Sequence, residues 1–177
     1  MKNTEDKIPT LLTIINKQGG TGIVYVRSRK LTVEYANILQ KHGVSATFYH
    51  AGLSHEEREK KQESWKSNKI QVIVCTNAFG MGIDKPDVRF VVNLDLPESI
   101  EAYFQEAGRA GRDEQKAFAV MLVNKSDEIV LKDKVASKFP DLEVIKRVYA
   151  LIMNHLRLAI GAGAVSYTHL TLPTKVT

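Results

Sequence analysis

Short apolar runs that alternate with segments of helical spacing constrain this chain more than any other feature. Each run is five to seven residues long, which suits a buried strand. The predicted strands are Gly22–Val26, Ala46–His50, Gln71–Thr76, Phe90–Asp95 and Ala117–Val123. This alternation is typical of an α/β fold in which helices cover both faces of a parallel sheet.

The segments between and beyond these runs are predicted to be helical. They are Ile8–Lys17, a helix with Leu31 and Leu39 that ends at Gly43, a polar helix anchored by Trp65, Pro97–Ala107, Asn124–Phe139 and Leu142–Ile160. Ser54 and Glu57 have the spacing of a capping box at the start of the polar helix. Ile100 and Phe104 belong to the apolar stripe expected on the Pro97–Ala107 helix. The last helix has a broad apolar face, which we expect to pack on something outside this chain.

Composition excludes several classes of protein. The chain has 177 residues, enough for one sizeable core, and its net charge of +5 permits a nucleic-acid partner without requiring one. A single cysteine, Cys75, excludes an internal disulfide and a cysteine-rich zinc cluster, and its place in an apolar run predicts an unreactive core thiol. The sequence shows no signal peptide and no apolar run of membrane-spanning length. We therefore expect a cytoplasmic protein without a membrane partner.

A glycine-flanked turn with two arginines follows the predicted Pro97–Ala107 helix. Arg109 and Arg112 are three positions apart and can converge, while Gly108 and Gly111 let the backbone come close to a ligand. This arrangement predicts a site for a multiply charged anion. Ligands of parallel sheets bind beyond the carboxyl ends of the strands. We therefore expect the candidate residues that directly follow the strands to lie along that edge of the sheet.

Three segments together resemble one protein family. Gln105–Asp113 (QEAGRAGRD) resembles the sixth motif of superfamily 2 helicases in its RecQ form, and Thr76–Phe90 (TNAFGMGIDKPDVRF) resembles the fifth. Tyr49–Leu53 is similar to the segment between the fourth and fifth motifs. The resemblance covers about Thr21–Lys125 and implies the second RecA-like lobe of a RecQ-type DNA helicase, which unwinds duplex DNA in the 3′ to 5′ direction in repair and recombination.

The resemblance also implies roles at an ATP site. Arg112 would be the arginine finger, Arg109 would contact phosphate or the seam between lobes, and Gln105 would polarise the site. Asp84 would lie near the nucleotide ribose, with Gly82 in the same glycine-bearing loop. In the residues alone, a surface ion-pair cluster is the alternative for the two arginines, and a plain turn is the alternative for the loop.

A second set of residues would face the nucleic acid strand. The resemblance places Ser28 and Arg29 in the fourth motif, and it places Thr76 and Asn77 against the DNA backbone. His50 could contact a phosphate, and Gly52 permits close backbone approach. The residues alone leave other readings open, because Ser28 could simply cap a helix and His50 could be a hydrogen-bonded loop histidine.

The ATP site is expected to be incomplete in this chain. The sequence has no P-loop and no Asp-Glu-x-His motif, so we expect the Mg²⁺ ligands in an absent N-terminal lobe and an inactive fragment. The predicted organisation is a helical lead-in over residues 1–20, the lobe over 21–125 and a helical linker over 126–163. Residues 164–177 resemble the translation of a sequencing adapter rather than native structure.

The sequence is also compatible with two other functions. The first is an RNA helicase lobe of the DEAD-box type. The sixth motif of those proteins resembles His-Arg-x-Gly-Arg, whereas this chain has Gln105–Arg109, and the difference favours the RecQ form. The second is a stand-alone nucleic-acid-binding module without ATPase activity, which the missing P-loop favours. The partners expected for the RecQ-type helicase are single-stranded or duplex DNA and the N-terminal helicase lobe.

Overall fold

The computed structural model describes residues 7–79, 84–138 and 140–156. The chain divides into two compact units, residues 1–131 and 132–177. The second unit begins within α5 (Lys125–Lys138) and contains α6 (Leu142–His155). Gly82, the residues beyond 156 of the last predicted helix and the adapter-like residues 164–177 lie outside the described residues.

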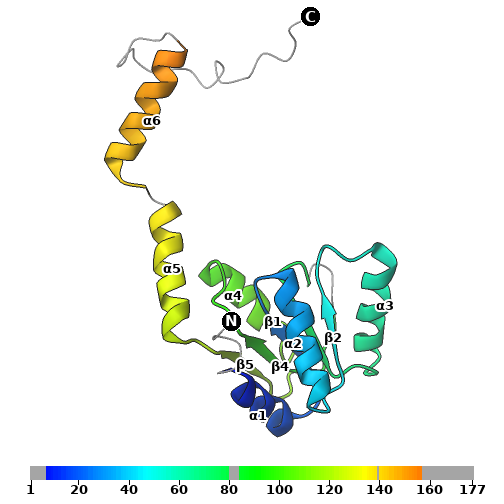
Figure 1. The fold of residues 1–177 in the computed structure, drawn as a ribbon. Helices are drawn as coiled ribbons and strands as arrows, with labels where there is room; N and C mark the ends of the chain where they lie inside the picture. The colour runs from blue at the N-terminus through cyan, green and yellow to red at the C-terminus, as the bar shows by residue number, and fades with distance from the viewer. Residues whose placement is uncertain (1–6, 80–83, 139, 157–177) are drawn as a thin grey trace, which may run out of the picture. The chain divides into compact units, whose positions relative to one another are not determined.

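A parallel sheet forms the centre of the first unit (Figure 1). Its strands are β1 (Thr21–Tyr25), β2 (Ala46–Tyr49), β3 (Val72–Cys75), β4 (Val88–Asn93) and β5 (Phe118–Met121). Their order across the sheet is β2-β3-β1-β4-β5, and every pair is parallel. The predicted α/β fold is confirmed, and each strand lies within two residues of its predicted bounds.

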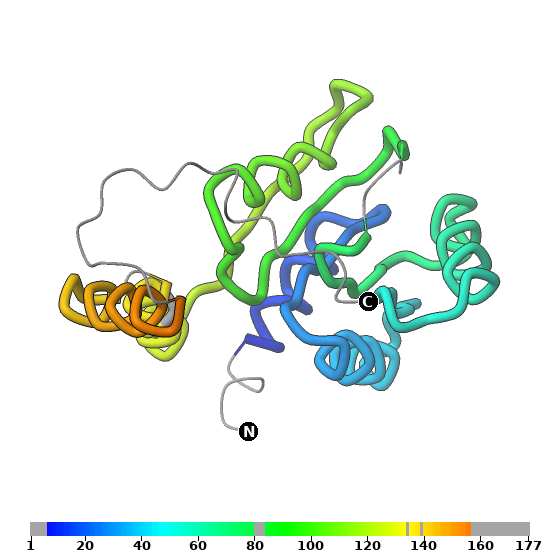
Figure 2. The backbone as a smooth tube through the Cα atoms, turned by 90° about the horizontal axis from the view of Figure 1, so that it is seen from above, coloured from blue at the N-terminus to red at the C-terminus, as the bar shows by residue number. Residues whose placement is uncertain are grey.

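Helices cover both faces of this sheet. On one face, Leu11 and Ile15 of α1 (Ile8–Gln18) and Leu39 of α2 (Arg29–Lys41) pack against Val24 and other strand residues. On the other face, α3 (His55–Lys66) contributes the fully buried Trp65. Figure 2 shows α2 and α4 (Ile100–Ala107) on opposite sides of the strands. Alternate side chains of β1, β3 and β4 therefore enter two different cores, which explains why these strands read as continuous apolar runs.

The polar helix α3 is held at both ends, as the sequence predicts. Ser54 and Glu57 form the predicted capping box, in which the Ser54 backbone N–H donates to Glu57 Oε2 over 3.0 Å and the Glu57 N–H donates to Ser54 Oγ over 3.2 Å. At the other end the indole Nε1 of Trp65 donates to the Gly22 carbonyl over 3.2 Å. One large anchor thus attaches an otherwise solvated helix to β1.

One prediction about α4 is wrong. The helix begins at Ile100 rather than Pro97, because Ser99 caps it by accepting a hydrogen bond from the Ala102 N–H over 3.2 Å. Two residues of its apolar stripe face solvent, since Ile100 is 71% exposed and Phe104 is 68% exposed. In the described part of the chain, no helix combines the length and the apolar character that a membrane crossing requires.

A buried ion pair ties the amino-terminal end of the first unit to the first turn of α5. The Lys7 ammonium lies 2.6 Å from Asp127 Oδ2 and also donates to the Leu94 carbonyl. Asp127 accepts a second hydrogen bond from the Asn124 N–H over 2.9 Å. Both charges are nearly inaccessible to water, so each depends on the other.

We expect Asp127→Asn to lower the free energy of unfolding by about 3 kcal/mol or more, because the change leaves the Lys7 ammonium buried without a counter-charge. Urea denaturation of the 177-residue chain at pH 7 measures this loss. The matched control is Glu59→Gln, which removes an exposed pair with His55 and should cost less than about 1 kcal/mol. Equal losses in the two variants would contradict the role assigned to the buried pair.

Candidate functional site

The carboxyl ends of the central strands lie next to one another. Tyr25, the last residue of β1, is in register with Cys75 on β3 and with Asn93 on β4. Cys75 is also in register with Tyr49 on β2. The segments that follow these strands carry most of the predicted site residues, so the sheet gathers them along one edge as expected.

Arg29, His50 and Gly52 come together at this edge. A Cβ atom added to Gly52 would lie 3.0 Å from Arg29 Nη1 and 3.3 Å from His50 Nδ1, so the glycine occupies the space between the two side chains. Arg29 is exposed and His50 is half-buried, with its ring stacked on Phe48. An exposed cation, an imidazole and an accessible backbone suit a phosphate group.

Ser28 and Thr76 have structural roles at the same edge. Ser28 caps α2 because its Oγ accepts a hydrogen bond from the Leu31 N–H over 3.1 Å. Thr76 is buried, its N–H donates to the Tyr49 carbonyl over 3.3 Å, and its carbonyl accepts from the Phe79 N–H over 2.9 Å. The next residue, Asn77, is exposed. Thr76 therefore shapes the turn that presents Asn77.

The arginine turn, Gly108–Asp113, is hydrogen-bonded to the chain just before and at the start of β4. The Gly111 N–H donates to the Val88 carbonyl over 2.9 Å, and the Asp113 N–H donates to the Pro86 carbonyl over 3.3 Å. Gly111 has a φ of +67°, and a Cβ atom there would lie 2.9 Å from the Gln115 carbonyl oxygen. Only glycine fits this backbone without strain, which explains the second glycine of the motif.

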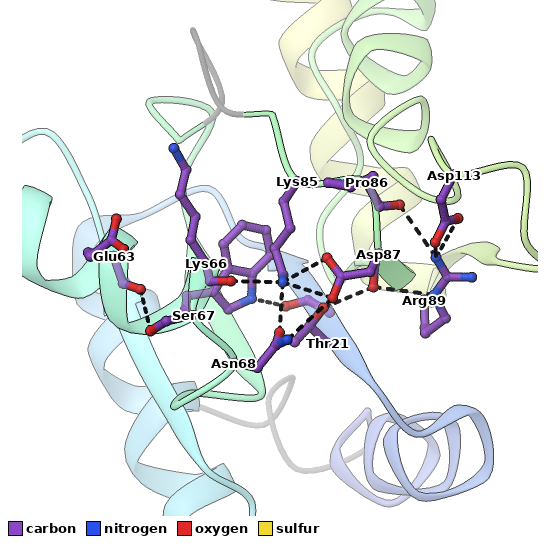
Figure 3. A network of polar contacts seen from close by, with 12 residues as sticks. Thr21, Glu63, Lys66, Ser67, Asn68, Lys85, Pro86, Asp87, Arg89 and Asp113 are labelled. Carbon is purple, nitrogen blue, oxygen red and sulfur yellow. Dashed lines mark hydrogen bonds and ion pairs between the residues drawn. The ribbon is translucent and has the colours of Figure 1, made fainter.

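Side chains reinforce the attachment of the turn, as Figure 3 shows. Arg89 Nη2 contacts both carboxylate oxygens of Asp113 at 2.6 and 2.5 Å. The hydrogen bonds from Arg89 hold the pKa of the Asp113 carboxyl below its usual range. The turn that carries the two arginines is thus fixed to β4 through backbone and side chain.

Lys85 anchors the segment that leads into β4. Its buried ammonium donates to Asn68 Oδ1 over 2.7 Å, to the Lys66 carbonyl over 3.1 Å and to Asp87 Oδ2 over 3.0 Å (Figure 3). No role was predicted for Lys85, although it lies within the segment that resembles the fifth motif. The contacts join the end of α3 to the segment that holds the arginine turn.

The two arginines of the turn have different surroundings. Arg112 is exposed, and its Nη1 lies 3.0 Å from Asp84 Oδ1. Arg109 is only 8% exposed and lies against the sheet. The structure therefore brings Asp84 and Arg112 together and directs the two arginines to different places. Gln105, in the last turn of α4, is exposed.

A buried polar group beside Arg109 escaped the sequence prediction. Asn93 is 1% exposed, and its Nδ2 donates to Glu106 Oε2 over 2.5 Å. The Tyr25 hydroxyl donates to the Phe79 carbonyl over 3.3 Å. Burial raises the pKa of Tyr25 and of the Cys75 thiol, so both stay neutral. The one available signal was Asn93 itself, a polar residue at the end of an apolar strand.

The described residues offer no group of three histidine, cysteine or acidic side chains that could hold a metal ion. The anion-binding capacity of the site comes instead from Arg112 on its anchored turn. A guanidinium on a fixed backbone, with glycines beside it, suits the oxygens of a nucleotide phosphate.

Comparison with known proteins agrees with this geometry. Residues 6–114 match the family model of the helicase conserved C-terminal domain. The chain is 48% identical over 128 residues to RecQ-like DNA helicase blm-1 of Caenorhabditis elegans, covering 70% of this chain and 13% of that protein. It is 46% identical over 155 residues to ATP-dependent DNA helicase RecQ of Haemophilus influenzae, covering 88% of this chain and 24% of the relative. The chain thus spans a quarter or less of these two relatives.

Among solved structures, the chain is similar to the E. coli DEAD-box protein SrmB. The TM-score is 0.66 with 29% sequence identity, and the match covers 77% of this chain and 81% of that one. The fold is therefore shared with DEAD-box proteins, while the sequence is considerably nearer to the RecQ-named relatives.

We expect Asp113→Asn to destabilise the chain at pH 7 and to lose this effect in acid. A carboxyl with a depressed folded-state pKa stabilises the fold above its unfolded pKa, about 3.9, and the stabilisation disappears as the pH falls through the lower folded value. Denaturation of both proteins at pH 7 and below about pH 3 measures the gap. Glu114→Gln, at the exposed neighbouring residue, is the control. Equal stability of Asp113→Asn and the unmodified chain at pH 7 would contradict the anchoring role.

Proposed function

We propose that this chain, which belongs to the helicase C-terminal domain family, works as the second motor lobe of an ATP-dependent DNA helicase. The premise is its similarity to RecQ helicases, which identifies it as the C-terminal lobe of a RecQ-type helicase. The observation that carries the proposal is the arginine turn, which holds Arg112 exposed and 3.0 Å from Asp84 on a backbone attached to the start of β4. DNA, the N-terminal lobe and a cytoplasmic location belong to the same proposal.

The nucleotide side of the lobe is built from Arg112, Asp84 and Gln105. Arg112 neutralises charge that develops on the transferred phosphoryl group, which is the role of an arginine finger. Asp84 holds the Arg112 guanidinium within 3.0 Å in this chain and would exchange that contact for one near the ribose when the lobes close. Arg109, behind it, supports the seam between the lobes.

ATP and Mg²⁺ fit this scheme only in part. Arg112, with exposed Gln105 nearby in the motif, suits the phosphate chain of ATP, which supplies the phosphoryl group that water removes. Mg²⁺ prefers carboxylate and phosphate oxygens, and the described residues contain no cluster of acidic side chains that could hold it. The magnesium ligands are therefore assigned to the N-terminal lobe.

The DNA side is built from the residues that follow β1, β2 and β3. Arg29 and His50 bind a backbone phosphate, and Gly52 lets the strand approach closely between them. Ser28 and Thr76 contribute through the backbone that they shape, and Asn77 offers an exposed amide. These contacts read the phosphate backbone, so the lobe binds without sequence preference and can step along a strand.

The fold shared with DEAD-box proteins supports a second candidate, a lobe that moves on RNA. The same phosphate contacts would serve either nucleic acid. The identity to RecQ-named relatives favours DNA. Stimulation of ATP hydrolysis by single-stranded DNA and by RNA of the same sequence distinguishes the two.

We expect Arg112→Ala, in the full-length helicase that contains this lobe, to lower the DNA-stimulated rate of ATP hydrolysis by about 10³- to 10⁵-fold. The exposed side chain contributes little to packing, so the thermal unfolding temperature should change little. The control is Lys116→Ala, which removes an exposed cation four residues further along. Retention of more than about a tenth of the rate would exclude the finger role.

We expect Arg29→Ala to weaken binding of single-stranded DNA equally for all sequences. Loss of one phosphate contact should also reduce the slope of log affinity against log salt by about one. Titrations of labelled oligonucleotides at several salt concentrations measure both quantities. Lys41→Ala, in the last turn of the same helix, is the matched control. An unchanged salt slope in Arg29→Ala would show that Arg29 does not contact phosphate.

A further inference from the structure

A surface cavity lies where α3 packs beside β2, the strand at one edge of the sheet (Figure 1). The cavity has a volume of about 310 Å³ and is lined by Thr47, Glu57, Lys60, Lys61, Ser64 and Ile70. The four lining residues that belong to α3 have the spacing of one helix face. The cavity therefore brings two ammonium groups and two hydroxyl groups together.

The Lys61 side chain extends from α3 to the edge strand. Its Nζ donates to Thr47 Oγ1 over 3.2 Å and lies 3.7 Å from the centre of the Phe48 ring. The face of an aromatic ring attracts an ammonium group but does not neutralise its charge. Burial lowers the pKa of Lys61, because the charged form is partly removed from water. An anion bound in the cavity would stabilise that charged form.

Glu57 is a carboxylate in this lining, and it is already hydrogen-bonded. It precedes Lys61 by four residues, which is the spacing at which glutamate and lysine pair favourably on a helix. Its Oε2 instead accepts from the backbone N–H and from the hydroxyl of Ser54, each over 3.0 Å, in the capping box. The two lysines outnumber this glutamate, so the lining carries a net positive charge.

The cavity adjoins the phosphate contact proposed for the nucleic acid. The Phe48 ring that Lys61 contacts is also stacked on the His50 ring, with centroids 5.7 Å apart and an angle of 23° between the planes. His50 follows β2 and lies beside Gly52. A strand bound at His50 therefore has to pass only one aromatic ring, along β2, to bring a further phosphate to Lys61.

We propose that Lys60 and Lys61 form a second phosphate site, which binds a further backbone phosphate of the strand that contacts His50. The proposal rests on the DNA-binding function proposed above and extends the path of the strand from the sheet edge onto α3. The Thr47 hydroxyl accepts from Lys61 and keeps its own proton to donate to a phosphate oxygen. Lysine binds phosphate as a point charge, so the site accepts any base sequence.

The salt dependence of oligothymidylate binding to the full-length helicase tests this site. Lys61→Met removes the charge and keeps an unbranched side chain beside Phe48, so it should reduce the slope of log affinity against log salt by about one. The reduction should appear only with strands long enough to reach both sites, whereas Arg29→Ala should weaken the shortest strands as well. The matched control is Lys66→Met, which removes a cation of the same helix outside the cavity.

Lys60→Met is a second variant that leaves packing unchanged, because Lys60 is exposed. It should lower the salt slope in the same way without changing the thermal unfolding temperature. In both lysine variants we expect kcat for ATP hydrolysis at saturating DNA to stay within about twofold, while the DNA concentration that gives half-maximal stimulation rises. This combination distinguishes a DNA contact from a contact with the nucleotide.

Acetylation of lysines locates the strand independently of affinity and activity. Single-stranded DNA should protect Lys60 and Lys61 of the full-length helicase from an acetylating reagent and should leave Lys66 unprotected, as measured by mass spectrometry of the digested protein. Inorganic phosphate and ATP, each added alone, should give no protection. Protection by either of these would assign the cavity to a free anion and overturn the proposal of a strand site.

The outcomes separate this proposal from the one on which it rests. If DNA leaves the acetylation of Lys61 unchanged while Arg29→Ala lowers the salt slope, the second site is overturned and the proposed DNA contacts stand. If DNA protects Lys61 but Arg29→Ala leaves the slope unchanged, the site on α3 is supported and the contact proposed for Arg29 is overturned. Unchanged slopes in both Lys61→Met and Lys60→Met would exclude the cavity as a phosphate site.

Discussion

The parallel pairing of the strands is the constraint on which the other features depend. Between one parallel strand and the next, the chain must cross back over a face of the sheet. The segments that follow the strands therefore all begin at one edge. Residues as distant in sequence as Arg29, His50 and Asn77 are thereby gathered along one edge. The geometry of the ladder, rather than any single side chain, creates the surface proposed for the nucleic acid.

Buried cations join distant segments of the first unit. Lys7, Lys85 and Arg109 are each less than a tenth exposed, and Lys7 and Lys85 bind acceptors from other segments of the chain. A buried cation leaves its neighbours little freedom, because any rearrangement would strand a charge away from water. The net positive charge of the chain therefore has two components. Buried cations stabilise the fold, whereas exposed cations such as Arg29 and Arg112 are accessible to phosphate groups.

The sequence predicted the architecture well, because apolar periodicity and capping residues are local signals. The strands, the capping box of α3 and the anchoring role of Trp65 could all be derived from residues near one another. The start of α4 was wrong because Ser99 competes with Pro97 as a starting signal, and only the fold decides between them. The exposure of Ile100 and Phe104 on α4 could not be predicted, because periodicity identifies an apolar face but not the surface that covers it.

The candidate site was less predictable, since its geometry depends on contacts between distant segments. The motif presents two arginines three residues apart, and nothing in that spacing says that one is buried and the other exposed. The distinction comes from the fold, because the turn is placed by hydrogen bonds to the carbonyls of Pro86 and Val88, which reach it only after the sheet has formed. A motif therefore determines which residue types are present, but contacts with the sheet determine which of the two arginines is buried and which is exposed. For the same reason, replacing the motif alone in another lobe would transfer the arginines without transferring their arrangement.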